Sequence, residues 1–362
     1  PSGSIGASIG YAQGYGTILG ANLSENNFLG SGKQLSVGIN RSTYQESVNL
    51  SFTEPYFTVD GVSVGYSIFA RETDYDQINV SSFSTNSKGA NVNWGYPISE
   101  VERVGFGVGF ENLDIRYGNY ASQEIRNFID TNGSNFDVFN LNLNWRKSTL
   151  NRGIFATRGT SQSLALNIAL PGSGLEYYKA TYKGQYLRGL TRSLSLKLRA
   201  DLGYGESYGD TTQLPFFKNF YGGGFGSVRG FESNSLGPQD TPCSGSAESC
   251  NNASAYNRPD PIGGNVQVEF GSEVIFPMPF VKDKRSMQSA FFIDAGNIFN
   301  TKCGDTQLNC FKPDVGELRY SVGVGVTWLS AMGPLTFSYA KPLNASEYDE
   351  TEMFQFSLGN QF

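Results

Sequence analysis

The four cysteines are the side chains of this sequence best suited to covalent or metal chemistry, and they form two local pairs. Cys243 and Cys250 are separated by six residues, as are Cys303 and Cys310. Four cysteines allow three disulfide connectivities, but both pairs lie inside polar stretches, which favours the two local bridges. A zinc site normally needs closer spacing and more ligands. We therefore expect two small disulfide loops and an oxidising compartment.

Arg229 is the second candidate, within the motif Val228-Arg229-Gly230-Phe231 at the end of a glycine-rich run. The run is not followed by Lys-Ser/Thr or by a helical pattern, so a phosphate-binding loop is poorly supported. The guanidinium of arginine carries a fork of donors that matches a carboxylate, and a buried arginine must be paired. The alternative is that Arg229 is an exposed surface charge.

The composition excludes several classes of function. The chain of 362 residues has no histidine, which removes the commonest general base and metal ligand. No other nucleophile–base arrangement stands out, so we expect no enzyme, no metal and no cofactor. The formal net charge is −6 and no basic block occurs, which argues against nucleic acid as a partner. No apolar run reaches 18 residues, which excludes a helical membrane protein.

Secondary-structure elements must position these residues, and the sequence predicts them through an alternation of polar and apolar residues. Near the start, Ile5, Ile9 and Tyr11 share one parity, and small or polar residues occupy the other. A period of two predicts strands with one apolar face. We expect an all-β fold with about sixteen strands, near residues 2–11, 17–24, 34–43, 46–54, 61–71, 87–97, 102–113, 137–147, 157–170, 176–188, 193–206, 263–276, 287–296, 316–328, 333–342 and 352–362.

Three features favour a transmembrane barrel over a secreted multi-sheet protein, which is the alternative. Many predicted strands have ten or more residues, the length that a tilted strand needs to cross a bilayer. Aromatic residues gather at strand ends, as in an interfacial girdle. Long connections, at 72–86, 114–136, 207–262 and 297–315, alternate with short turns. With an even number of strands, both termini are expected on the short-turn, periplasmic side of a bacterial outer membrane.

Parity also indicates carboxylates that could face Arg229. On the strand predicted at 263–276, Glu269 and Glu273 lie on the face opposite to the apolar residues. On the strand predicted at 287–296, Asp294 shares its parity with Phe292, so the polar face is less clearly defined there.

The first and last predicted strands have unusual compositions. The first holds Gly3, Gly6 and Gly10 together with small residues, so its packing against a neighbouring strand should be weak. An alternative reason for these glycines is relief of curvature or crowding. The last strand is apolar on one face and the chain stops at Phe362, the terminal pattern by which outer-membrane barrels are recognised for assembly. A weak seam would leave a strand edge that can template an incoming strand by β-augmentation.

Several segments together resemble the BamA family, the central subunits of the β-barrel assembly machinery of Gram-negative bacteria. They cover essentially the whole chain and comprise Val228–Phe231, Asn219–Gly223, Asn234–Pro238, Asn26–Gly32, Thr53–Phe57 and Gly333–Leu335. The resemblance implies one barrel domain over 1–362, with the 207–262 loop folded into the lumen and Arg229 paired with Glu273 and Asp294. Family members carry periplasmic POTRA domains ahead of the barrel, which we expect to be absent from a chain that opens in a strand at Pro1.

The resemblance further implies an outer-membrane insertase that folds client barrels through a lateral gate between its first and last strands. The expected partners are nascent barrel proteins, outer-membrane lipids and accessory lipoproteins that dock mostly on POTRA domains. A protein-translocation pore of the two-partner-secretion type is the alternative, and a passive porin or adhesin is a third. The gate residues expected from the seam are Ser2, Gly3, Ser4, Ile5, Gly6, Gly10, Phe356, Leu358, Gly359 and Phe362.

Overall fold

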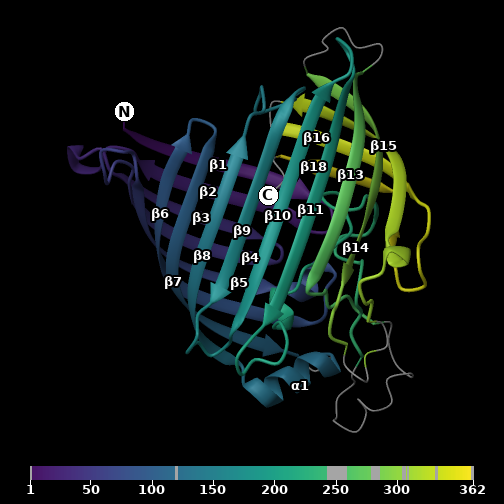
Figure 1. The fold of residues 1–362 in the computed structure, drawn as a ribbon, viewed down its shortest axis with the longest axis horizontal. Helices are drawn as coiled ribbons and strands as arrows, with labels where there is room; N and C mark the ends of the chain where they lie inside the picture. Colours follow the sequence, from purple (N-terminus) through teal and green to yellow (C-terminus); the bar gives the residue numbers. More distant parts are fainter. Residues whose placement is uncertain are drawn as a thin grey trace.

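The computed structural model describes residues 2–118, 121–242, 259–278, 286–303, 307, 310–330 and 333–359, and these form a closed antiparallel barrel (Figure 1). Each strand pairs with its neighbours in chain order, and β1 closes the barrel against β18. The expected sixteen-stranded barrel is confirmed. Its strands are β1 (Gly3–Ala12), β2 (Gly16–Glu25), β3 (Gln34–Ser42), β4 (Gln45–Glu54), β5 (Ser63–Asp74), β6 (Phe83–Ser99), β7 (Glu102–Tyr117), β8 (Asn135–Ser148), β9 (Gly159–Ala169), β10 (Tyr177–Gly189), β11 (Ser195–Ser207), β13 (Val266–Pro277), β14 (Met287–Phe299), β15 (Arg319–Ser330), β16 (Gly333–Pro342) and β18 (Phe354–Leu358).

The apolar faces of the strands point outward. Leu164, Leu198, Phe270 and Phe291 are exposed on neighbouring parts of the wall, although they are large hydrophobic residues. Charged residues of the opposite parity, such as Glu269, are buried inside. Sequence parity alone could not distinguish inside from outside. The structure has the arrangement of a lipid-facing barrel and not that of a soluble sandwich.

A short helix and the long loops cover one end of the barrel. Helix α1 (Gln123–Asn132) lies beyond the end of β7, at the bottom of Figure 1. The Ser122 side chain accepts a hydrogen bond from the Ile125 amide, and Gly133 ends the helix with a φ of 87°. Ile125 and Phe128, one turn apart, are buried in the apolar cluster under the loops. No helix among the described residues is long and apolar enough to cross a membrane.

The segment 114–136 was predicted as a long connection without a helix being foreseen, and it connects β7 to β8 through α1. An isolated helix of ten residues is marginal in water, and this one is stabilised by the cluster on which it packs. The remaining elements are short 3-10 turns and a two-residue pairing of β12 (Gly230–Phe231) with β17 (Thr351–Glu352); the turns are η1 (Phe28–Gly30), η2 (Tyr75–Ile78), η3 (Phe216–Lys218) and η5 (Val315–Glu317).

The seam between β1 and β18 is the weakest junction in the wall. Ten register pairs join β1 to β2, and five join β16 to β18. Among the described residues, which end at Gly359, only two pairs join β1 to β18, Tyr11 with Leu358 and Ala12 with Ser357. The last strand was predicted at 352–362, whereas β18 begins at Phe354; Gly359 has a φ of 93°, and residues 360–362 lie outside the described residues. Glu352 instead pairs with the long loop.

Candidate functional site

The structure places Arg229 against both carboxylates that the resemblance assigned to it. Its Nε lies 2.7 Å from Oδ2 of Asp294, and its Nη2 lies 2.9 Å from Oδ1, so the pair is bidentate. Nη2 also lies 2.8 Å from Oε1 of Glu273. The Arg229 side chain is 12% exposed, and that of Asp294 is fully buried. Burial alone would lower the pKa of Arg229, but its bonds and charge pairing with Asp294 and Glu273 outweigh burial and raise it.

Phe292 completes this site and was missed in the sequence. The Arg229 guanidinium carbon lies 3.4 Å from the centroid of the Phe292 ring, in cation–π contact. Phe292 and Asp294 share the inward face of β14, and Phe292 stands opposite Glu273 in the register with β13. The mixed parity of this strand was the signal: an aromatic residue faces the lumen because a cation covers it.

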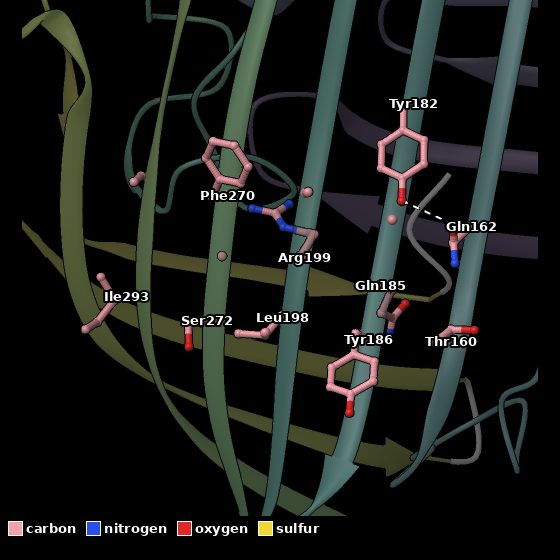
Figure 2. A pocket seen from close by; sticks show the side chains of 14 residues that line it. Thr160, Gln162, Tyr182, Gln185, Tyr186, Leu198, Arg199, Phe270, Ser272 and Ile293 are labelled. Carbon is pink, nitrogen blue, oxygen red and sulfur yellow. Dashed lines mark hydrogen bonds between the residues drawn. The ribbon is translucent and has the colours of Figure 1, made fainter. Parts of the chain in front are cut away.

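The loop tip before Arg229 is held by a second arginine that sequence reasoning also missed. Arg199 on β11 donates to the backbone carbonyls of Gly226 and Ser227. The Ser227 hydroxyl donates in turn to Glu269. Figure 2 looks at this part of the wall, where Arg199 comes from β11 between the strands that carry Tyr182 and Phe270. Two arginines, one on the loop and one on the wall, thus fix the loop tip inside the barrel.

The remainder of the motif packs against the last strand. Val228 and Phe231 are fully buried, together with Leu236 of the same loop. Gly230 has a φ of 91°, and a side chain there would meet Ala340 at 3.1 Å, so this position requires glycine. The Gln355 side chain on β18 accepts from the Gly230 amide at 3.3 Å and donates to the Phe231 carbonyl at 2.7 Å. The motif therefore links the loop directly to the seam.

The predicted gate residues lie along the seam, but few of them touch across it. Leu358 is the member of the set with a register partner in β1, and the Phe356 ring stacks on Tyr11 with centroids 5.1 Å apart. Gly359 approaches Gly10 so closely that a side chain on Gly359 would lie 3.4 Å from its Cα. Phe362 lies outside the described residues, and none of the residues described up to Gly359 is a register partner of Ser2, Gly3, Ser4, Ile5 or Gly6 in β18.

One of the two predicted disulfides is confirmed. Cys303 and Cys310 are bonded, with their Cα atoms 5.7 Å apart. Cys243 and Cys250 lie outside the described residues.

Farther along, the long loop is pinned to the other loops around Asp240. Ser81 donates to one Asp240 carboxylate oxygen, and the Asp260 amide donates to the other at 2.9 Å. The next residue, Thr241, donates through its amide and hydroxyl to Glu124 at the start of α1, at 2.9 and 2.6 Å. Burial, supported by neighbouring carboxylates, raises the pKa of Asp240 to about 8.

Taken together, hydrogen bonds and ion pairs connect the wall, the long loop and the last strand at this site. Charged pairs fix the loop inside the barrel, and the loop holds β18. Within the part of residues 2–359 that the structure describes, the backbone of β1 from Gly3 to Gly10 has no register partner in β18. Such an edge can bind another strand.

Comparison with known proteins identifies the family of this barrel. Residues 27–362 match the Omp85 superfamily domain. The chain is 35% identical over 390 residues to the outer membrane protein assembly factor BamA of Neisseria meningitidis, covering 100% of this chain and 47% of that protein. It is 24% identical to the SAM50-like protein CG7639 of Drosophila melanogaster, covering 99% of this chain and 76% of that protein.

Comparison with solved structures also finds similarity to a BamA barrel. BamA from Haemophilus ducreyi lacking POTRA domains 1–3 superposes with a TM-score of 0.89 at 31% identity, covering 98% of this chain and 69% of that chain. The chain spans about half the length of the bacterial BamA relatives that it matches in full. The resemblance to the BamA family that the motifs indicated is confirmed, and since the superfamily domain covers nearly the whole barrel, the chain belongs to the Omp85 superfamily.

Proposed function

We propose that this chain is the barrel of an outer-membrane insertase, which folds client β-barrels at the seam between β1 and β18. The observation that carries the proposal is the edge of β1, where, in the part of the chain that the structure describes, the eight residues Gly3–Gly10 have no β18 partner in the register. Relatives named as outer membrane assembly factors share this barrel. Catalytic residues are not required, because the work is strand pairing.

The free edge would act by β-augmentation. In a bilayer each unsatisfied backbone N–H or C=O costs several kcal/mol, so a strand that pairs with this edge is strongly favoured. The terminal strand of a client barrel supplies a complementary edge and an apolar face for the lipid. β1 would hold that strand while the client adds its remaining strands, and the seam would serve as the lateral gate.

Strand length supports insertion at this place. β1, β2, β3 and β4 have 9 or 10 residues each, whereas β6 and β7 on the same barrel have 17 and 16. At about 3.3 Å per residue, the wall beside the seam is much lower than the wall at β6 and β7. A bilayer that matches the lower wall is thinner there, which would reduce the barrier to a client entering it.

The same proposal implies a membrane location and a set of partners for the chain. The chain would lie in the outer membrane with both termini in the periplasm, and nascent barrels and lipids would meet it at the seam. Accessory lipoproteins would act through POTRA domains of the kind removed from the Haemophilus ducreyi protein. The alternative of an export pore is weaker, because relatives that match this whole chain are named assembly factors.

A reversible lock on the seam tests the proposal. Ala12→Cys with Ser357→Cys places two thiols at a register pair of the seam, and Ala7→Cys with Ala21→Cys places them at a pair between β1 and β2. In liposomes, the oxidised seam variant should fail to insert an eight-stranded barrel diluted from urea, and reductant should restore insertion. The β1–β2 variant should insert in both states. Insertion at the unmodified rate by the locked seam would refute the gate.

A further inference from the structure

The side chain of Gln13 completes the seam at the end that lies beside the long loop. The carboxamide of Gln13 accepts a hydrogen bond from the Phe356 amide at 3.1 Å and lies 3.4 Å from the Phe354 carbonyl, to which it donates. It also donates to the Glu352 carboxylate. Gln13 therefore touches β18 through two backbone groups of its edge and through the residue two positions before it.

The Gln13 carboxamide occupies the position where a backbone hydrogen-bonding partner of β18 would lie if the β1–β18 pairing continued. The register pairs Tyr11 with Leu358 and Ala12 with Ser357, so the next pair would bring residue 13 opposite Phe356. The main chain cannot continue, because it turns after Ala12 and the Tyr15 amide bonds back to the Ala12 carbonyl at 3.0 Å. A primary amide has one donor and one acceptor group, like a peptide unit, and can replace it on a strand edge.

The long loop holds Gln13 from the other side. The Ser233 hydroxyl donates to the backbone carbonyl of Gln13 at 3.2 Å. The Tyr15 hydroxyl donates to the side-chain oxygen of Asn234 at 3.0 Å. The same loop binds β18 through Gln355. Gln13 thus lies at the junction of the first strand, the last strand and the loop that carries Arg229.

We propose that Gln13 is a positioning residue for strand entry, whose carboxamide holds the long-loop end of the seam closed and must leave β18 before a client strand can extend beyond Gly10 of β1. This inference rests on the proposed insertase function. It divides β1 into two parts. The eight positions Gly3–Gly10 can accept a strand without breaking any β1–β18 register pair, whereas the next positions require Tyr11, Ala12 and then Gln13 to separate from β18.

Amide exchange at Phe356 tests the contact itself, in the full chain reconstituted in nanodiscs. Gln13→Ala removes the acceptor of this amide, and the loss of one hydrogen bond predicts exchange about threefold to tenfold faster. Gln45→Ala is the matched control, since Gln45 donates to Thr73 at 3.1 Å beside the turn that follows β3, away from the seam. Unchanged exchange at Phe356 in Gln13→Ala would overturn the proposal.

Exchanging the amide and the carboxylate between Gln13 and Glu352 distinguishes a positioning role of Gln13 from a general loss of stability of the seam. Gln13→Glu puts a carboxylate against the Glu352 carboxylate and the Phe354 carbonyl, so exchange should rise further than in Gln13→Ala. Adding Glu352→Gln restores an amide–carboxylate pair in the reverse sense, and exchange should return toward the native rate. If the double variant exchanges as fast as Gln13→Glu alone, the contact with Glu352 does not position the residue.

Insertion is measured on the same preparations, with an eight-stranded barrel diluted from urea as the client. Gln13→Ala should raise the rate of insertion at least threefold, with the control unchanged. Faster exchange with an unaltered insertion rate would show that the contact is not part of strand entry. Failure of the unmodified chain to insert any client would refute the insertase function instead, and the exchange result would still decide the contact.

Discussion

Replacing Arg229 with alanine should destabilise the barrel more than the loss of any single exposed charge. The substitution leaves Asp294 fully buried without its bidentate partner and removes one of the cations beside Glu273. Breaking a buried pair in this way costs about 3–5 kcal/mol, since a charge remains in a medium that solvates it poorly. Arg229→Lys keeps the charge but loses the fork and the flat contact with Phe292, so we expect about half that cost.

The measurement is the urea midpoint of the folded barrel in detergent micelles, together with the rate at which protease cuts the long loop. Arg41→Ala is the matched control, because Arg41 pairs with Glu46 at 3.0 Å while both side chains stay more than half exposed. Such a pair contributes at most about 1 kcal/mol.

A double-variant cycle identifies the pair itself. Asp294→Asn in the Arg229→Ala background removes the stranded charge, so the second substitution should cost less than it does alone, by about 1–3 kcal/mol. If Arg229→Ala left both the midpoint and the protease rate at the values of the control, the reasoning from the buried ion pair would be wrong.

Three further outcomes are expected. Because burial raises the pKa of Asp240 to about 8 in the fold, the folded loop around this carboxyl is most stable below about pH 4 and loses stability as pH rises to 8. Proteolysis of the long loop should speed up over that range, and Asp240→Asn should flatten the dependence. Arg199→Ala removes the donors to Gly226 and Ser227, so amide exchange at the loop tip should rise about tenfold or more while the Arg229 pairs remain. Replacing Cys303 and Cys310 by serine should leave the barrel midpoint nearly unchanged, because the bridge closes a loop of only a few residues, and a large drop would contradict its local role.

Particular residues show how far sequence reasoning reached. The period-two pattern gave the number of strands, but it missed α1, since Ile125 and Phe128 form a helix only with the cluster under the loops to pack on. The last strand was predicted to start too early, at Glu352, because alternation does not reveal that Glu352 pairs with the long loop instead. The disagreement in parity at Phe292 was a real signal, but a cation over an inward-facing ring cannot be inferred from one strand.

The sequence by itself determined the strands, their apolar faces and the need of Arg229 for a carboxylate, because alternation and side-chain chemistry are local properties. Only the tertiary structure decided which face is outside, that Phe292 and Arg199 take part in holding the loop, and how little of the described β18 is paired with β1. These features depend on contacts between residues far apart in the chain, such as Gln13 with Phe356 or Arg229 with Asp294. No local pattern fixes such a contact, since it exists only when the barrel closes and the long loop is packed inside it.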